Sequence, residues 1–409
     1  MTSFRFGLLA GLALAAAAGT GTFEPRVWPS EAPADCPFER SKTVSGIRFT
    51  GRWVRYANAD TWYPSWAADG NLYSPWTDGR VDAAHANSAG PRATTGYATI
   101  VGDDPLHLQF LHPGVVAGDP APYGGRYPSA SLVRNGIWYY GTYCLMDSDG
   151  DPGKGLNWDI LGPFVGFRIS RDFGKTWTEG PRTPARPLFP EPLRPGDKVR
   201  FGAPHFVDFG RNMQYSPDGR AYLVAHGARD PDPRPREANA SWITGDQVYL
   251  ARVKPGPRAI NNRDRWQFFA GYNQRGKPLW THEFLRIKPL IDWNNNCGNV
   301  SITYDAPLRK YFMSVTDGGN TISKFNTYIL ESDHVAGPWK LVVYMRAFGE
   351  QGYFVNIPSK FISADGRKAW LCYSANFSNG NKNWNTRHQP IPPGGGYGMC
   401  LQEIELLGQ

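Results

Sequence analysis

The stretch YPSASLVRNGIWYYGTY (Tyr127 to Tyr143) contains the repeating unit that indicates the fold, two short apolar segments joined by a turn. An apolar segment that opens with Tyr127-Pro128-Ser129 reaches an Asn135-Gly136 turn and is followed by a second, aromatic segment. Asn-Gly tolerates the positive φ angles of tight hairpin turns. The stretch therefore predicts two antiparallel strands.

The same unit occurs five times along the chain. The openings are Tyr63-Pro64-Ser65, Tyr127-Pro128-Ser129, Ala203-Pro204-His205, Asn299-Val300-Ser301 and Ile357-Pro358-Ser359. Their partner segments are Asn71 to Trp76, Ile137 to Tyr143, Ala221 to Gly227, Lys310 to Val315 and Lys368 to Ser374. No stretch shows a sustained helical period, and Gly and Pro are frequent. The repeat predicts an all-β protein, a five-bladed β-propeller.

The predicted domain organisation is simple. Residues 1–21 resemble a signal peptide, with Arg5 before an apolar run from Phe6 to Ala18, and this run is too short to span a membrane comfortably. Residues 22–46 form an irregular lead-in, and residues 47–409 form a single propeller domain. The segment from Ile47 to Trp53 is expected to close the ring by adding to the last blade. We expect an exported protein, periplasmic or secreted, without a membrane span.

Blade two contains Ser170-Arg-Asp-Phe-Gly-Lys-Thr-Trp177, the Asp-box pattern of sialidase-type propellers. In that pattern the Asp and Gly form a hairpin turn and the Trp packs beneath it. We therefore expect an Asp-box hairpin in blade two, in which Asp172 is structural.

The charge distribution and the cysteine content limit the classes of ligand and cofactor that the protein is expected to bind. The net charge is +8, but Lys and Arg are scattered along the sequence, so nucleic acid is not expected as a partner. The high aromatic content suits a carbohydrate-handling surface, and a polysaccharide or oligosaccharide is the expected ligand. The five cysteines show no metal-ligand spacing, so no metal or cofactor is expected. Cys372 and Cys400, on neighbouring predicted strands, are the best pair for a disulfide.

The sharpest local feature is DTWYPSWAADGNLYSPWTDG (Asp60 to Gly79). A hairpin brings its open ends together, so Asp60 and Asp78 should face one another while Asp69 lies at the distant turn. Two carboxylates that flank a groove can divide the acid and base, or acid and nucleophile, roles of glycoside hydrolysis. The simpler alternative is that Asp60 caps a strand and Asp78 forms a turn. Trp62 and Trp76 are expected to offer a stacking surface for sugar rings.

Other polar residues lie beside the five openings, which should converge on the channel mouth. We expect substrate contacts from Arg126, Tyr127, His205, Asn299, Asp317 and Asn356. Long loops, among them 147–162 and 379–397, are expected to wall a groove over the mouth.

The chain resembles glycoside hydrolase family 183, exported five-bladed propellers that are endo-acting D-arabinanases. The resemblance rests on the Asp60 to Gly79 stretch together with GPFVGFRISRDFGKTW (Gly162 to Trp177), YFMSVTDGGNT (Tyr311 to Thr321) and GYFVNIPSKFISADG (Gly352 to Gly366). It implies a paired-aspartate furanosidase whose two acids correspond to Asp60 and Asp78.

The sequence thus predicts a secreted glycoside hydrolase that cleaves within a furanose-containing, arabinan-like polysaccharide. One alternative is a polysaccharide lyase acting on a uronate-containing glycan, with His205, Tyr127 and Arg126 as its base and cation. Another is a non-catalytic carbohydrate-binding propeller.

Overall fold

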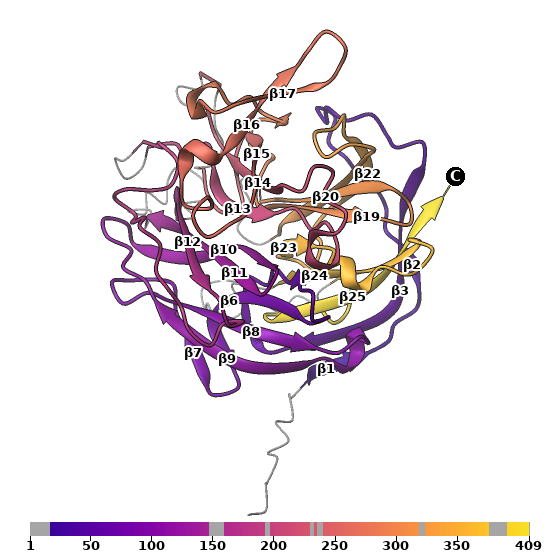
Figure 1. Ribbon diagram of the computed structural model, residues 1–409. Coiled ribbons are helices and arrows are strands. Elements are labelled where there is room, and N and C mark those ends of the chain that lie inside the picture. Colours follow the sequence, from indigo (N-terminus) through magenta and orange to yellow (C-terminus); the bar gives the residue numbers. More distant parts are fainter. Residues whose placement is uncertain are drawn as a thin grey trace, which may run out of the picture.

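The computed structural model describes residues 17–146, 159–192, 197–229, 233–234, 240–318, 324–375 and 391–408. Within these ranges the protein consists of five antiparallel sheets arranged around a common axis, as a five-bladed β-propeller (Figure 1), which confirms the predicted fold class. The helices of these ranges are single 3-10 turns: η1 (Pro105–His107), η2 (Arg211–Met213), η3 (Arg263–Arg265), η4 (Phe284–Arg286) and η5 (Ser359–Phe361). None of the described helices is long and apolar enough to cross a membrane.

The first two blades carry most of the residues that line the candidate site. Blade one consists of β4 (Asn58–Asp60), β5 (Ser65–Trp66), β6 (Leu72–Val81), β7 (Ala84–Ala86), β8 (Thr94–Val101) and β9 (Gln109–Ala117). Blade two is the sheet of β10 (Gly125–Arg134), β11 (Ile137–Met146) and β12 (Ile160–Ser170).

The next two blades follow in chain order. Blade three consists of β13 (Gly202–Phe206), β14 (Ala221–Gly227), β15 (Gln247–Val253), β16 (Gln267–Tyr272), β17 (Pro278–Thr281) and β18 (Ile291–Asp292). Blade four consists of β19 (Val300–Asp305), β20 (Lys310–Asp317), β21 (Asn326–Ser332) and β22 (Lys340–Met345).

Blade five joins the two ends of the chain. Its strands are β23 (Tyr353–Asn356), β24 (Lys368–Ser374), β25 (Met399–Gly408) and, from the N-terminal region, β3 (Val44–Tyr56), with β1 (Ala17–Gly21) and β2 (Arg26–Val27) paired to β3. In Figure 1 the yellow β25 runs beside the indigo β3, as their antiparallel register also shows. The expected closure of the ring by the segment after Ile47 is therefore confirmed.

The predicted hairpins agree with the strands in four blades. At the β10–β11 turn, Asn135 and Gly136 have φ angles of 50° and 77°, and Arg134 pairs with Ile137. The fifth opening is wrong by several residues: β23 ends at Asn356, and Ile357-Pro358-Ser359 leads into η5. Proline has no N–H for the ladder, and here Pro358 precedes the helical turn.

The Asp box forms its turn at the end of β12. The Asp172 carboxylate accepts hydrogen bonds from the Ser170 hydroxyl (2.7 Å) and from the backbone N–H (2.9 Å) and hydroxyl (2.6 Å) of Thr176. The Trp177 ring lies 5.1 Å from that of Trp138. The strand that returns from the turn is reduced to one bridge, between Ile169 and Thr178.

The predicted disulfide is wrong. All five cysteines are free thiols. Cys372 pairs with Leu401 across β24 and β25, and Cys400 pairs with Tyr373, so the two cysteines are offset by one residue. Because successive side chains alternate between faces, the thiols point to opposite sides of the sheet. They accordingly belong to different apolar clusters.

Candidate active site

A cavity of about 260 Å³ opens where the inner strands of several blades begin or end. Its lining combines carboxylates with aromatic and small side chains: Asp60, Thr61, Asp78, Ala89, Tyr127, Tyr143, Leu145, Asp159, Trp242 and Phe354. The two carboxylates singled out from the sequence, Asp60 and Asp78, are therefore both on its wall.

Strand pairing explains why these two residues meet. β4 and β6 are antiparallel, and Asp60 lies opposite Thr77, the residue before Asp78. The predicted distant position of Asp69 is also observed, since its carboxylate accepts hydrogen bonds from Asn71 and Tyr73 at the β5–β6 turn.

Asp60 is buried and both of its oxygens accept hydrogen bonds. Oδ1 accepts from the Thr61 hydroxyl (3.0 Å), and Oδ2 accepts from the Tyr353 hydroxyl (2.9 Å). These donors favour the ionised carboxylate, but removal from water and the nearby charge of Asp78 outweigh them. The pKa of Asp60 is therefore well above its ordinary value.

Asp78 is held by its own neighbours in blade one. Oδ1 accepts from the Ser88 backbone N–H (2.7 Å) and the Thr77 hydroxyl (3.3 Å), and the Tyr397 hydroxyl donates to its backbone carbonyl. Burial raises the pKa of Asp78 to about 6, although the Ser88 and Thr77 donors and the proximity of His85 act in the opposite direction.

The backbone of the cavity wall is strained at three residues. Thr61, Asp78 and Phe354 have φ angles of 64°, 48° and 54°. Non-glycine residues rarely adopt positive φ, and such residues cluster at sites where side-chain position matters more than local stability.

Aromatic rings form the rest of the wall. Tyr127 and Tyr143 lie with ring centroids 5.7 Å apart, and Trp242 and Phe354 lie 5.5 Å apart. Tyr127 was expected at the site from the sequence. Tyr143, Trp242 and Phe354 were not, because nothing in their local sequence distinguishes them from the aromatic residues of the blade cores.

A third carboxylate, Asp159, also lines the cavity, immediately before β12. The Ser241 hydroxyl donates to its backbone carbonyl (2.8 Å). Sequence reasoning did not single out Asp159, although it placed one end of a wall-forming loop here. Similarly, Tyr397 ends the other predicted loop and contacts Asp78.

Trp62 and Trp76 lie elsewhere, so the expected sugar-stacking surface is corrected. Their rings stack on each other at 6.4 Å in the core of blade one, with exposed fractions of 1% and 0%. The Trp62 indole N–H donates to the Ala59 carbonyl. Both rings serve packing because they are sealed between the strands, and neither presents a face to the cavity.

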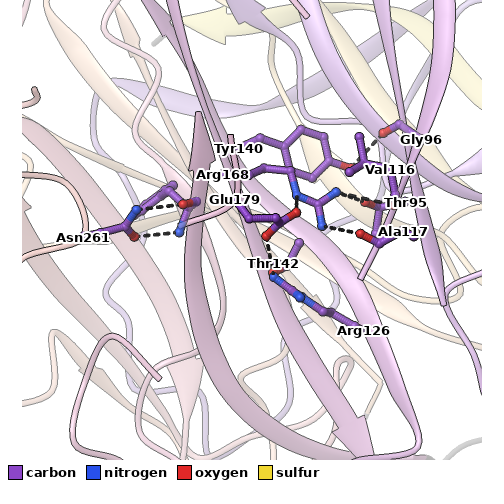
Figure 2. A network of polar contacts seen from close by, with 11 residues as sticks. Thr95, Gly96, Val116, Ala117, Arg126, Tyr140, Thr142, Arg168, Glu179 and Asn261 are labelled. Atoms are coloured by element: carbon purple, nitrogen blue, oxygen red, sulfur yellow. Dashed lines mark hydrogen bonds and ion pairs between the residues drawn. The ribbon is translucent and has the colours of Figure 1, made fainter. Parts of the chain in front are cut away.

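Arg126 also points away from the cavity. Its guanidinium donates to the Thr142 hydroxyl (3.0 Å) and lies 3.5 Å from the Glu179 carboxylate, which also pairs with Arg168 at 2.9 Å. Figure 2 shows this network, in which Arg168 reaches Thr95 and the carbonyls of Val116 and Ala117 on blade one. Neighbouring side chains on a strand alternate, so Tyr127 faces the cavity and Arg126 faces the contact between blades.

Four further sequence candidates are buried and do not line the cavity. The His205 ring stacks on Tyr63 at 3.3 Å, and burial beside His226 lowers its pKa well below the ordinary value.

The other three candidates form contacts inside the protein. The Asn356 amide donates to the Trp62 and Phe354 carbonyls. Asp317 accepts from the Tyr344 hydroxyl at 2.5 Å. Asn299 is 2% exposed and lies just before β19. Burial places these residues among structural contacts, and their expected role in substrate binding is not supported by a position on the cavity wall.

The described residues contain no group of three His, Cys, Asp or Glu side chains arranged to hold a metal ion.

Comparison with known proteins gives likenesses of shape. No protein-family model and no curated protein sequence matches the chain. Among solved structures, a putative hydrolase from Bacteroides ovatus aligns with a TM-score of 0.49 and 14% identity, over 92% of this chain and 96% of that one. An exo-1,5-α-L-arabinanase from a bovine ruminal metagenomic library aligns at 0.42 and 13%, over 85% and 93%. An α-L-arabinofuranosidase from Podospora anserina, in complex with cellotriose, aligns at 0.39 and 14%, over 93% and 96%. These likenesses concern the fold alone.

Proposed function

We propose that this protein is a glycoside hydrolase that cleaves within a furanose-containing, arabinan-like polysaccharide, with Asp60 and Asp78 as its acid pair. The observation that carries the proposal is the meeting of two carboxyl groups, both with raised pKa values, on the wall of one cavity. Of the Lys and Arg residues that the structure describes, none forms an ion pair with either carboxylate, and the charge of Asp78 instead raises the pKa of Asp60.

The pair can hold one proton between its members over a range of pH. Loss of the first proton, for Asp78 near pH 6, places a negative charge beside Asp60 and raises the pKa of Asp60 further. Glycoside hydrolysis needs this state, in which one carboxylic acid protonates the leaving oxygen while the other, ionised, attacks the sugar carbon or activates water.

The lining favours a neutral sugar. Among the described residues no Lys or Arg lines the cavity, so nothing there would neutralise the carboxylate of a uronate. The set considered for a lyase is not assembled, because Arg126 pairs with Glu179 and His205 is packed on Tyr63. The aromatic wall of Tyr127, Tyr143 and Trp242 suits the apolar faces of sugar rings.

The finer substrate assignment follows the resemblance to endo-acting D-arabinanases in the stretch from Asp60 to Gly79, with export of the protein as a further expectation. The test is to incubate the purified protein with arabinan, arabinogalactan and a uronate-containing glycan and to analyse the products. Reducing ends from an arabinan, without ultraviolet-absorbing unsaturated products, support the proposal. Unsaturated products would identify a lyase, and saturable binding without products would identify a binding protein.

The two aspartates are then tested with Asp60→Asn and Asp78→Asn, with Asp69→Asn at the distant turn as the matched control. Both site variants should lose cleavage while the control keeps it. An aryl furanoside with a good leaving group should restore activity to the variant that lacks the acid, because departure then needs no proton. Azide should restore activity to Gly variants of the base or nucleophile. Full activity in either Asn variant would refute the paired mechanism.

A further inference from the structure

A basic groove lies at the end of β12 that is remote from the cavity. β12 is an 11-residue strand that begins after the cavity residue Asp159 and ends before Arg171. At about 3.3 Å per residue, its two ends are about 30 Å apart. Arg171 lines both a hollow of about 760 Å³ and an adjoining one of about 410 Å³, and these two hollows make up the basic groove.

Two segments that are distant in sequence supply cations to this groove: the residues after β12 and the connection between β15 and β16. Arg171 follows β12, Lys254 follows β15, Arg258 lies in the loop between β15 and β16, and Arg265 ends η3. All four are exposed, and within the described part of the chain none forms an ion pair. Arg258, like Arg171, lines both hollows, so these two residues connect them.

The acidic groups of the groove are already engaged. Asp264 lies 3.7 Å from the Arg263 guanidinium, and Glu179 pairs with Arg168. Two further cations of the lining are engaged by the protein: Arg220 pairs with Asp218, which lies outside the lining, and Arg182 donates to the Asn261 carbonyl. The groove therefore keeps an excess of positive charge that the protein itself does not neutralise, in a molecule of net charge +8.

We propose that the basic groove binds an acidic polysaccharide through the carboxylate or phosphodiester groups along its chain. Its length across two hollows suits an extended polymer rather than a single small anion. As far as the structure describes it, the lining contains Pro255 and Pro257 but no Phe, Tyr or Trp on which bases of single-stranded nucleic acid would stack. Bound this way, the protein would stay on an anionic glycan while the cavity remained open to its own substrate.

The groove is tested by the retardation of the full chain in native gels that contain polygalacturonate, which carries carboxylates, or a teichoic acid, which carries phosphodiesters. The groove variant Arg171→Gln, Lys254→Gln, Arg258→Gln, Arg265→Gln is compared with the matched variant Lys42→Gln, Arg275→Gln, Lys277→Gln, Lys368→Gln. The second set removes the same charge from exposed positions outside the groove.

The groove variant should weaken binding at least about tenfold at low salt, and the matched variant should stay within about twofold. The double variant Arg171→Gln, Arg258→Gln, at the junction, should give most of the loss, and thermal unfolding should show that all variants fold. Binding of either polymer supports the proposal and identifies the group recognised. Equal losses in the two sets, no retardation of the unaltered protein, or tighter groove-dependent binding of oligo(dT) would overturn it. Because Asp78→Asn should leave retardation unchanged, failure of the cavity assignment is distinguishable from failure of the groove.

Discussion

Asp78 and Asp172 are both aspartates near the end of a blade strand and close to a glycine, yet the structure gives them opposite properties. Asp172 is held at an exposed turn by the Ser170 and Thr176 donors, which lower its pKa to about 2. Asp78 is buried beside another carboxyl group, and its pKa is about 6. Hydrogen-bond donors at an exposed turn hold the Asp172 carboxylate in its charged form, whereas burial outweighs the donors at Asp78 and keeps a proton available for chemistry.

The largest expected effect separates the two residues by activity. Asp78→Asn should lower kcat/KM on the responsive glycan by at least about 10³-fold, because Asn cannot transfer a proton or act as a carboxylate. Asp172→Asn should stay within about twofold of the unaltered protein, since its turn lies at the end of β12 remote from the cavity. Comparable losses in both variants would mean that Asp78 acts through folding.

The pH profile should report the same contrast. Below about pH 6, kcat/KM should fall by about tenfold per pH unit as Asp78 takes up a proton, and it should fall again at higher pH when Asp60 loses its own. For Asp172→Asn, kcat/KM should fall at the same acid and alkaline pH values as for the unaltered protein. A flat rate between pH 4 and 7 would contradict the assignment of the acid limb to Asp78.

Tyr353→Phe tests whether the alkaline limb of the pH profile reports the ionisation of Asp60. Removing the hydroxyl that donates to Asp60 Oδ2 destabilises the ionised form, so the alkaline limb should move up by about one pH unit. Tyr373→Phe is the matched control, because the Tyr373 hydroxyl accepts a hydrogen bond from the Gln402 amide and, in the part of the chain that the structure describes, bonds to no carboxylate. A shift of similar size in both variants would point to a general loosening of the core.

The smallest effect, on stability, should have opposite signs at the two aspartates. The raised pKa of Asp78 means that its contribution is complete below about pH 4 and is lost as the pH rises through about 6. Asp78→Asn should therefore match the unaltered protein near pH 4 and be more stable by about 1–2 kcal/mol at pH 8.

The lowered pKa of Asp172 gives the mirror image. Its stabilisation is present above about pH 4 and is lost as the pH falls through about 2, so Asp172→Asn should unfold at a lower temperature at pH 7 and approach the unaltered protein in acid. Urea unfolding curves of the two variants across this pH range provide the measurement. A stability loss for Asp78→Asn at pH 8 would show that its carboxylate is a structural group.

The propeller and the proximity of Asp60 to Asp78 could be predicted from the sequence, because both depend on local patterns. Alternating apolar segments joined by turns such as Asn135-Gly136 define hairpins, and a hairpin necessarily brings Asp60 near Asp78. Which aromatic rings face the cavity and which fill the blades depends on how the blades pack against one another. In the folded protein Trp62 and Trp76 are buried in blade one, whereas Tyr143 and Trp242 line the cavity. Asp159, at the start of β12 in blade two, also lines it.

Tertiary structure also brought Arg171, which follows β12, beside Lys254, Arg258 and Arg265 of the connection between β15 and β16, so that they form one groove. Local patterns cannot show this, because a side chain's partner across blades depends on how the strands are stacked around the axis. The burial and the electrostatic environment of a side chain depend on its neighbours in space, and these neighbours are defined only once the ring has closed by pairing of β3 with β25.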